Sequence, residues 1–144
     1  MRFFNTEGPV RADLHYRLPP LQRWDLDEIL RLIAQQKYFL LHAPRQTGKT
    51  TCLLALMDYL NAEGRYQAVY ANLEGAQAWR EQVDPGMATV VTDIASWAHH
   101  WLGDARLPQL ARQVLATTPS GSALGDFLSQ WSATAPRPLV LLLD

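Results

Sequence analysis

Apolar residues recur at helical spacing in several stretches of this chain. After Asp25, four of them fall at positions i, i+3, i+4 and i+7, which predicts a helix with one apolar face: Leu26, Ile29, Leu30 and Ile33. The same spacing predicts four further helices, near residues 49–61, 84–102, 108–116 and 123–132. Gly64 and Gly103 follow two of these segments, and glycine commonly ends a helix.

Three short runs between the helices are apolar almost throughout. They lie at residues 38–43, 67–73 and 139–143, and their length is typical of strands that are buried on both faces. Strands that alternate with helices along a chain indicate an α/β layer fold with a parallel sheet. That is the fold class we expect.

The first twenty residues follow neither pattern. Gly8-Pro9 and Pro19-Pro20 interrupt them, so we expect residues 1–20 to form an irregular N-terminal arm. The full chain of 144 residues has the length of one ordinary domain, and 48% of it is hydrophobic, which is sufficient for a core. We therefore expect a single folded domain over residues 21–144.

A phosphate-binding loop is predicted where the first apolar run gives way to a helix. The loop pattern is a glycine, four free residues and then Gly-Lys-Ser/Thr. Here Ala43 stands in place of the first glycine, and the rest of the pattern is intact. The residues expected to contact nucleotide are Ala43, Pro44, Arg45, Gln46, Thr47, Gly48, Lys49, Thr50 and Thr51.

Each residue type in this segment suits a nucleoside triphosphate. Backbone N–H groups curled around phosphates form an anion-binding nest, and the start of the following helix adds its positive dipole end. Gly48 leaves space where backbone and phosphate approach most closely, and Lys49 would contact the β- and γ-phosphates. The hydroxyl of Thr50 would bind Mg²⁺, which prefers oxygen ligands. We therefore expect ATP with magnesium as the ligand.

The third apolar run ends on an acidic residue. Leu139–Leu143 followed by Asp144 has the form of a Walker B strand, whose aspartate supplies a further oxygen near the metal ion. The predicted metal ligands are therefore Thr50 and Asp144. Glu74 follows the second run and could face either the γ-phosphate or solvent.

Taken together, these segments resemble bacterial AAA-like P-loop ATPases of the archaeal-ATPase type. Residues 43–51 are similar to their Walker A motif, residues 4–10 with His15 and Tyr16 to their N-terminal stretch, and residues 139–144 to the apolar half of their Walker B motif. The resemblance implies a P-loop NTPase three-layer sandwich over residues 21–144, with Walker A at 43–50. It also implies that ATP is the nucleotide and that residues 16–23 line the adenine pocket.

The resemblance also implies features for which this sequence has no counterpart. In the family an acidic residue follows the Walker B aspartate, and a polar sensor residue and an arginine finger come later. Because the sequence ends at Asp144, we expect a C-terminally incomplete domain in which hydrolysis is slow or absent, and no catalytic residue is assigned. A fragment, a truncated reading frame and a chain with shifted strands all fit this pattern.

Composition narrows the choice of partners and location. A net charge of −1 argues against a broad nucleic-acid surface, and no apolar run approaches the roughly 18 residues that span a membrane. The N-terminus lacks the apolar segment of a signal peptide. Cys52 is the only cysteine, so no internal disulfide can form. We expect a cytoplasmic protein that binds nucleotide, and a protein partner or homo-oligomer stays open.

Two other functions remain as alternatives. A P-loop phosphotransferase would carry basic lid residues, whereas Arg106, Arg112 and Arg137 are scattered along the chain. A nucleotide-independent interaction module would not need Lys49 and Thr50, and both are intact. Mg-ATP binding therefore explains the motif best.

Overall fold

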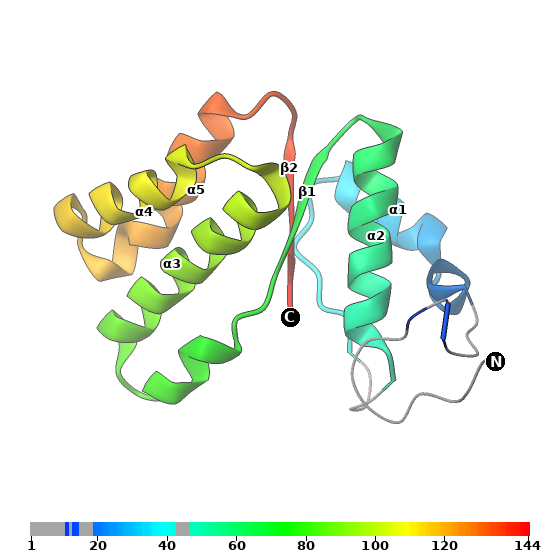
Figure 1. Ribbon diagram of the computed structural model, residues 1–144, viewed down its shortest axis with the longest axis horizontal. Helices are drawn as coiled ribbons and strands as arrows, with labels where there is room; N and C mark the ends of the chain where they lie inside the picture. The colour runs from blue at the N-terminus through cyan, green and yellow to red at the C-terminus, as the bar shows by residue number, and fades with distance from the viewer. Residues whose placement is uncertain (1–10, 12, 15–18, 43–46) are drawn as a thin grey trace. The chain divides into compact units, whose positions relative to one another are not determined.

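The structure, a computed structural model, describes residues 11, 13–14, 19–42 and 47–144. The chain divides into two compact units, residues 1–59 and 60–144, and we describe each unit by itself. The first unit contains η1 (Pro20–Arg23), α1 (Leu26–Ala34) and most of α2 (Lys49–Glu63). The second contains β1 (Gln67–Ala71), η2 (Glu74–Trp79), α3 (Val83–Leu102), α4 (Arg106–Thr117), α5 (Ser120–Thr134) and β2 (Leu139–Leu143) (Figure 1).

Helix α1 forms where its apolar spacing predicts it. The carboxylate of Asp25 accepts a hydrogen bond from the backbone N–H of Glu28 at 3.1 Å, so Asp25 caps the helix. Ile29 and Ile33, one turn apart on the predicted apolar face, are both buried. The prediction for this helix is confirmed, and it extends only to Ala34.

Helix α2 begins at Lys49 and ends at Glu63, followed by a glycine with φ of +86° at Gly64. A left-handed glycine at that position closes the helix, as the sequence predicts. In the second unit, the Asn61 side chain accepts from the N–H of Ala68 at 2.9 Å and donates to its C=O at 3.0 Å. These two bonds fix the end of α2 to strand β1.

The sheet of the second unit consists of β1 and β2 in parallel pairing. Gln67 is paired with Leu139 at one end and Ala71 with Leu143 at the other. Residues 68–71 are buried, as an apolar strand packed on both faces requires. The expected parallel pairing is therefore confirmed for the second and third apolar runs. The sheet has two strands within the described residues.

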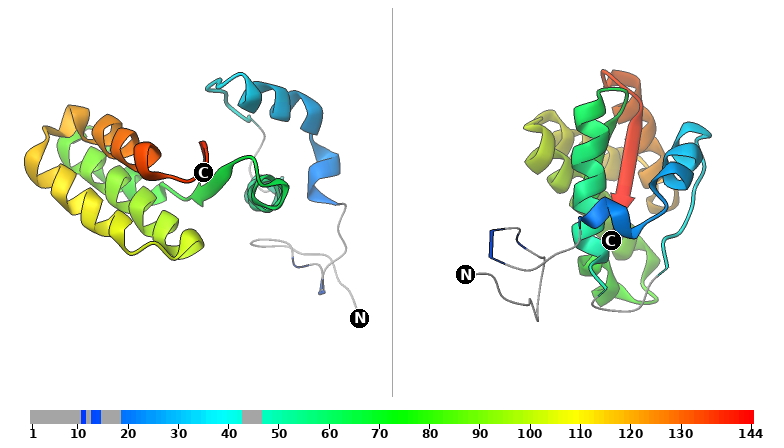
Figure 2. Two further views of the ribbon diagram at one scale, coloured as in Figure 1. Left: turned by 90° about the horizontal axis from the view of Figure 1, so that it is seen from above. Right: turned by 90° about the vertical axis from the view of Figure 1, so that its right-hand side faces the viewer.

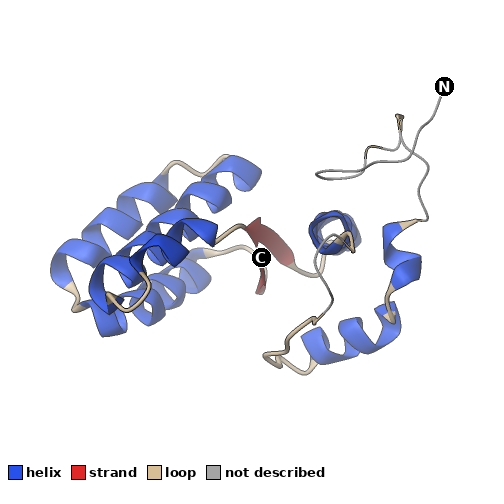
Figure 3. Cartoon of the chain, turned by 90° about the horizontal axis from the view of Figure 1, so that it is seen from below, coloured by secondary structure: helices blue, strands red, loops and turns tan. Residues whose placement is uncertain are grey.

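Helices α3, α4 and α5 pack together on one side of these strands (Figures 1 and 2). Their shared core has twelve buried members: Val69, Ala71, Val91, Ile94, Ala95, Ala98, Leu107, Ala111, Val114, Ala123, Phe127 and Trp131. Figure 3 shows that helices make up most of this unit and that the strands are short. Gly103, with φ of +69°, ends α3 as predicted. The second unit is thus a mixed helical unit built on a small parallel sheet.

The expected strand at 38–43 is wrong over its described residues. Residues 38–42 form no strand, and residue 43 lies outside the described chain. Tyr38 is fully exposed and Leu40 is 85% exposed. A strand persists only when a second backbone satisfies its N–H and C=O groups, and in the described residues only β1 and β2 pair. An apolar run alone does not supply that partner.

Candidate functional site

The predicted phosphate loop is described from Thr47 onward. Ala43, Pro44, Arg45 and Gln46 lie outside the described residues. Thr47 and Gly48 directly precede α2, and its first turn begins with Lys49, Thr50 and Thr51. The N–H of Cys52 donates to the C=O of Gly48 at 3.0 Å, which is the first helical bond. The amides of residues 49–51 therefore belong to the positive end of the helix.

Gly48 suits its position chiefly through its backbone conformation. Its φ of +80° lies in the left-handed region, which costs a residue with a side chain about 1–2 kcal/mol. A Cβ atom built on Gly48 would also lie 2.6 Å from Nη1 of Arg23. The glycine thus allows both the sharp turn into α2 and the close approach of a cationic side chain.

Arg23 reaches this loop from η1, which precedes α1. Its Nη2 donates to the backbone C=O of Thr47 at 2.5 Å. The two residues are 24 positions apart, so no local sequence pattern identifies the contact. The structure therefore adds a basic side chain that the motif does not contain.

A hollow of about 350 Å³ lies beside the start of α2. Its volume falls within the range of small-molecule sites, roughly 300–1,000 Å³. The residues that line it are Arg23, Trp24, Leu41, His42, Thr47, Lys49 and Cys52. Two of these side chains are basic, and none of those described is a carboxylate. This arrangement favours an anionic ligand.

Cys52 is buried in the first turns of α2 and is 1% exposed. Its thiol donates to the C=O of Pro20 at 3.4 Å. Burial raises the pKa of the thiol, and the positive charge of Arg23 opposes that rise. Cys52 is therefore a protonated packing residue, consistent with the single-cysteine composition.

Asp144 belongs to the second unit, directly after strand β2. Its backbone continues the parallel ladder, because its N–H donates to Ala71 at 3.0 Å and its C=O accepts from Leu73 at 2.9 Å. The hydroxyl of Tyr70 donates to Oδ2 of Asp144 at 3.0 Å. Tyr70 is only 4% exposed. A buried phenol thus holds the carboxylate that the sequence predicts as a metal ligand.

Aromatic side chains of α3 contact Tyr70 and fix its position. The ring of Trp97 meets the Tyr70 ring edge-on, with 5.5 Å between centroids. The indole N–H of Trp101 donates to the C=O of Tyr70 at 3.0 Å. His100 packs edge-on against both Trp97 and Trp101. These contacts fix the phenol beside Asp144, and sequence spacing did not reveal them.

Thr50 and Asp144 stand in different units, so their joint role as metal ligands stays a prediction. A hydroxyl and a carboxylate are oxygen donors of the kind Mg²⁺ takes alongside phosphate oxygens and water. Among the described residues, no group of three or more His, Cys, Asp or Glu side chains could hold a metal ion.

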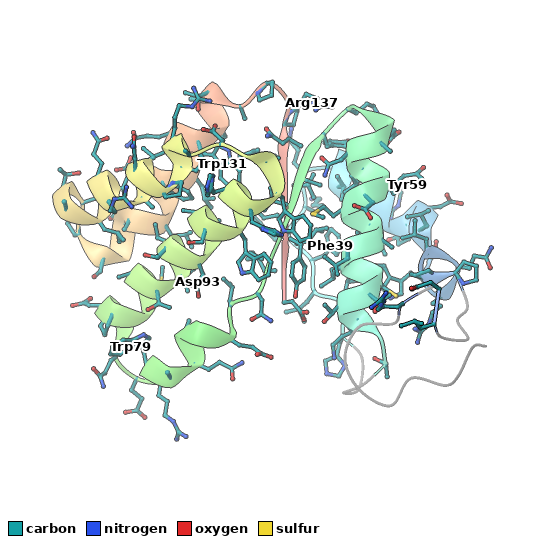
Figure 4. All side chains as sticks on the ribbon, in the orientation of Figure 1. Phe39, Tyr59, Trp79, Asp93, Trp131 and Arg137 are labelled. Atoms are coloured by element: carbon teal, nitrogen blue, oxygen red, sulfur yellow. The ribbon has the colours of Figure 1, made fainter. Side chains whose placement is uncertain are left out.

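Two acidic residues lie near the end of β1. Glu74 is exposed at the start of η2, and its N–H is held by the Asn72 side chain at 2.8 Å. Asp93 on α3 faces η2: a Cβ built on Gly75 would lie 3.1 Å from its Oδ2 (Figure 4). Partial burial raises the pKa of Asp93. The sequence analysis did not identify Asp93.

In comparisons with known proteins, no family model, no curated protein and no solved structure matches the chain. Within the described part of the chain, no helix has the length and apolar character to cross a membrane. Function must therefore be argued from the residues and their geometry.

Proposed function

We propose that this chain binds Mg-ATP through residues 43–51, as the nucleotide-binding part of a P-loop NTPase of the AAA-like kind. The observation that carries the proposal is the position of the motif at the start of α2. Gly48 turns at φ of +80°, the helix begins at the next residue, and Lys49 lines a hollow of about 350 Å³. The three-layer P-loop sandwich is part of the same proposal.

The electrostatics of this position favour a polyphosphate. The dipole of the first turn attracts negative charge, and the lysine adds a positive charge. A charge-assisted hydrogen bond of this kind contributes about 1.5–3 kcal/mol. None of the described residues that line the hollow is a carboxylate, which is consistent with an anionic ligand.

Magnesium enters the proposal through Thr50 and Asp144. The Thr50 hydroxyl belongs to the first turn of α2, and the Asp144 carboxylate follows β2. Both are oxygen donors, and Mg²⁺ is commonly bound by one or two protein oxygens with phosphates and waters. The proposal concerns binding, and it assigns no residue to hydrolysis.

Thermal unfolding with and without Mg-ATP tests this function. At about 100 times its dissociation constant, the ligand should stabilise the protein by about 2.7 kcal/mol. Lys49→Ala should reduce this stabilisation to about 0.4–1.4 kcal/mol, because binding roughly tenfold to a hundredfold weaker leaves the ligand at about 1–10 times its dissociation constant. Lys37→Ala is the matched control, because Lys37 is an exposed lysine of the same unit outside the hollow. An unfolding transition that ignores Mg-ATP, or equal shifts in both variants, would contradict the proposal.

A further inference from the structure

Arg23 differs from most arginines of the described chain in what it contacts. Four of the others form ion pairs with nearby carboxylates: Arg11 with Asp13, Arg31 with Glu28, Arg65 with Glu63 and Arg106 with Asp104. Arg23 has no carboxylate partner within the part of the chain that the structure describes. Its guanidinium donates instead to the backbone C=O of Thr47. Its charge is thus held at the loop without being neutralised there.

The guanidinium lies directly against the loop. Measured from a Cβ built on Gly48, Nη1 is at 2.6 Å, Cζ at 3.5 Å and Nη2 at 3.8 Å. Arg23 and Lys49 line the same hollow. Two basic side chains that line one hollow favour an anion between or beside them.

We propose that Arg23 is a second polyphosphate-binding cation of this loop, contributed from outside the motif. This inference rests on the proposed function and names a further residue of the same site. A guanidinium presents five donors in a planar fork that matches two phosphate oxygens, whereas Lys49 acts as a point charge. The C=O of Thr47 holds the side chain at the loop, where it meets a phosphate when the nucleotide binds.

The geometry distinguishes this role from a contact with the base. The resemblance to AAA-like ATPases places residues 16–23 around the adenine, which would need an apolar or base-edge contact. Arg23 instead packs its charged end on Gly48, next to the residue whose ammonium would contact the β- and γ-phosphates. Its affinity contribution should therefore persist for a ligand that has no base.

Calorimetric titration with ATP and with inorganic tripolyphosphate tests the inference. Arg23→Gln should weaken both ligands by a similar factor, roughly tenfold to a hundredfold. Arg23→Lys should retain part of the affinity, because it keeps the charge and loses the fork. The affinity of Arg23→Gln should also fall less steeply than that of the wild type as salt is added, since one screened charge is gone.

Arg137→Gln is the matched control. Arg137 also donates to a backbone C=O, that of Gly64 at 3.1 Å, and Gly64 also has a positive φ of +86°. Arg137 does not line the hollow. Its variant should bind both ligands within about twofold of the wild type, which is under 0.5 kcal/mol.

The outcomes separate this inference from the proposed function. If Lys49→Ala abolishes binding but Arg23→Gln binds tripolyphosphate like the wild type, the inference alone is overturned. The same holds if Arg23→Gln weakens ATP only, or if its salt dependence matches that of the wild type, which would indicate a structural effect. If the wild type binds neither ligand, the proposed function itself fails.

Discussion

Short apolar runs form strands in the second unit of this protein but not in the described part of the first. In the second unit, the apolar runs at 67–73 and 139–143 contain β1 and β2, which pair in parallel and carry a helical layer on one side. In the first unit, the run at 38–43 is equally apolar, yet residues 38–42 form no strand and Leu40 is exposed. An apolar run indicates a tendency to be buried, and a strand forms only where a second backbone pairs with it.

The units also differ in how their candidate chemistry is built. The phosphate loop of the first unit uses local geometry, because a left-handed Gly48 is followed at once by a helix that begins with Lys49. Asp144 of the second unit depends on contacts between residues far apart in the sequence, such as its bond with Tyr70. A short motif can therefore predict the loop, whereas only the fold reveals what holds the aspartate.

The largest expected difference between the two units is the loss of stability when a large apolar side chain is truncated. Phe127 is fully buried in the second unit, so Phe127→Ala should lower the free energy of unfolding by about 3–5 kcal/mol. Leu40→Ala should change it by no more than about 0.5 kcal/mol, because the side chain is 85% exposed. Urea unfolding followed by circular dichroism measures both. A large loss for Leu40→Ala would show that its segment is packed after all.

The turn before α2 gives the next largest effect. Gly48→Ala should destabilise the protein by about 1–2 kcal/mol, because alanine resists a positive φ. Its Cβ would also displace the guanidinium end of Arg23. Gly121→Ala is the control: Gly121 lies in α5 with open space where a Cβ would stand. That change should stabilise by about 0.4–1 kcal/mol. Equal effects at the two glycines would refute the special role of Gly48.

The bond between Tyr70 and Asp144 tests the long-range half of the comparison. Tyr70→Phe should cost about 1 kcal/mol of stability, because it removes one hydrogen bond and keeps the ring contact with Trp97. A double-mutant cycle with Asp144→Ala, which removes the acceptor, should show a coupling of similar size in urea unfolding. Tyr59→Phe, at an exposed tyrosine of α2, should change stability by less than about 0.5 kcal/mol. Strict additivity of the Tyr70 and Asp144 changes would contradict this account.

Asp93 should give the smallest effect, visible in its pH dependence. Burial raises the pKa of the Asp93 carboxyl in the folded state, so the folded chain binds this proton more tightly than the unfolded chain does. The stability from this group is complete below the ordinary aspartate pKa and is lost as pH rises through the raised folded value. Asp93→Asn should remove that loss and stabilise the protein at neutral pH by up to about 0.5 kcal/mol. Unfolding curves of the wild type and Asp93→Asn at pH 4 and pH 7 test this prediction. If Asp93→Asn is less stable than the wild type at pH 7, the prediction is wrong.

Sequence reasoning located most elements of this fold because their apolar spacing is regular. The sequence pattern predicted α1 directly after Asp25, the end of α3 at Gly103, and both strands of the sheet. Helices α4 and α5 begin at Arg106 and Ser120, two and three residues before the predicted starts. The first residues of α5 are small or polar and carry no apolar period, whereas in α4 the prediction left out Leu107, which is buried in the core. It also missed η2, whose six residues are too few for any period to show.

At the candidate site, the sequence predicted the residues whose function depends on their immediate neighbours. Lys49 and Thr50 stand at the start of α2 as expected. Arg23 was included only in the stretch expected to line the adenine pocket, and Tyr70 was not identified, because their contacts with Thr47 and Asp144 span 24 and 74 residues. Such contacts arise from chain topology, and neither periodicity nor motif spacing records them.

Direct titration of Mg-ATP into the protein, followed by calorimetry, tests the central claim most directly. The wild type and Lys37→Ala should bind one nucleotide per chain with the same affinity. Lys49→Ala should bind roughly tenfold to a hundredfold more weakly, because it loses a charge-assisted contact. The absence of saturable heat in the wild type, or equal affinity in Lys49→Ala, would contradict nucleotide binding at the start of α2.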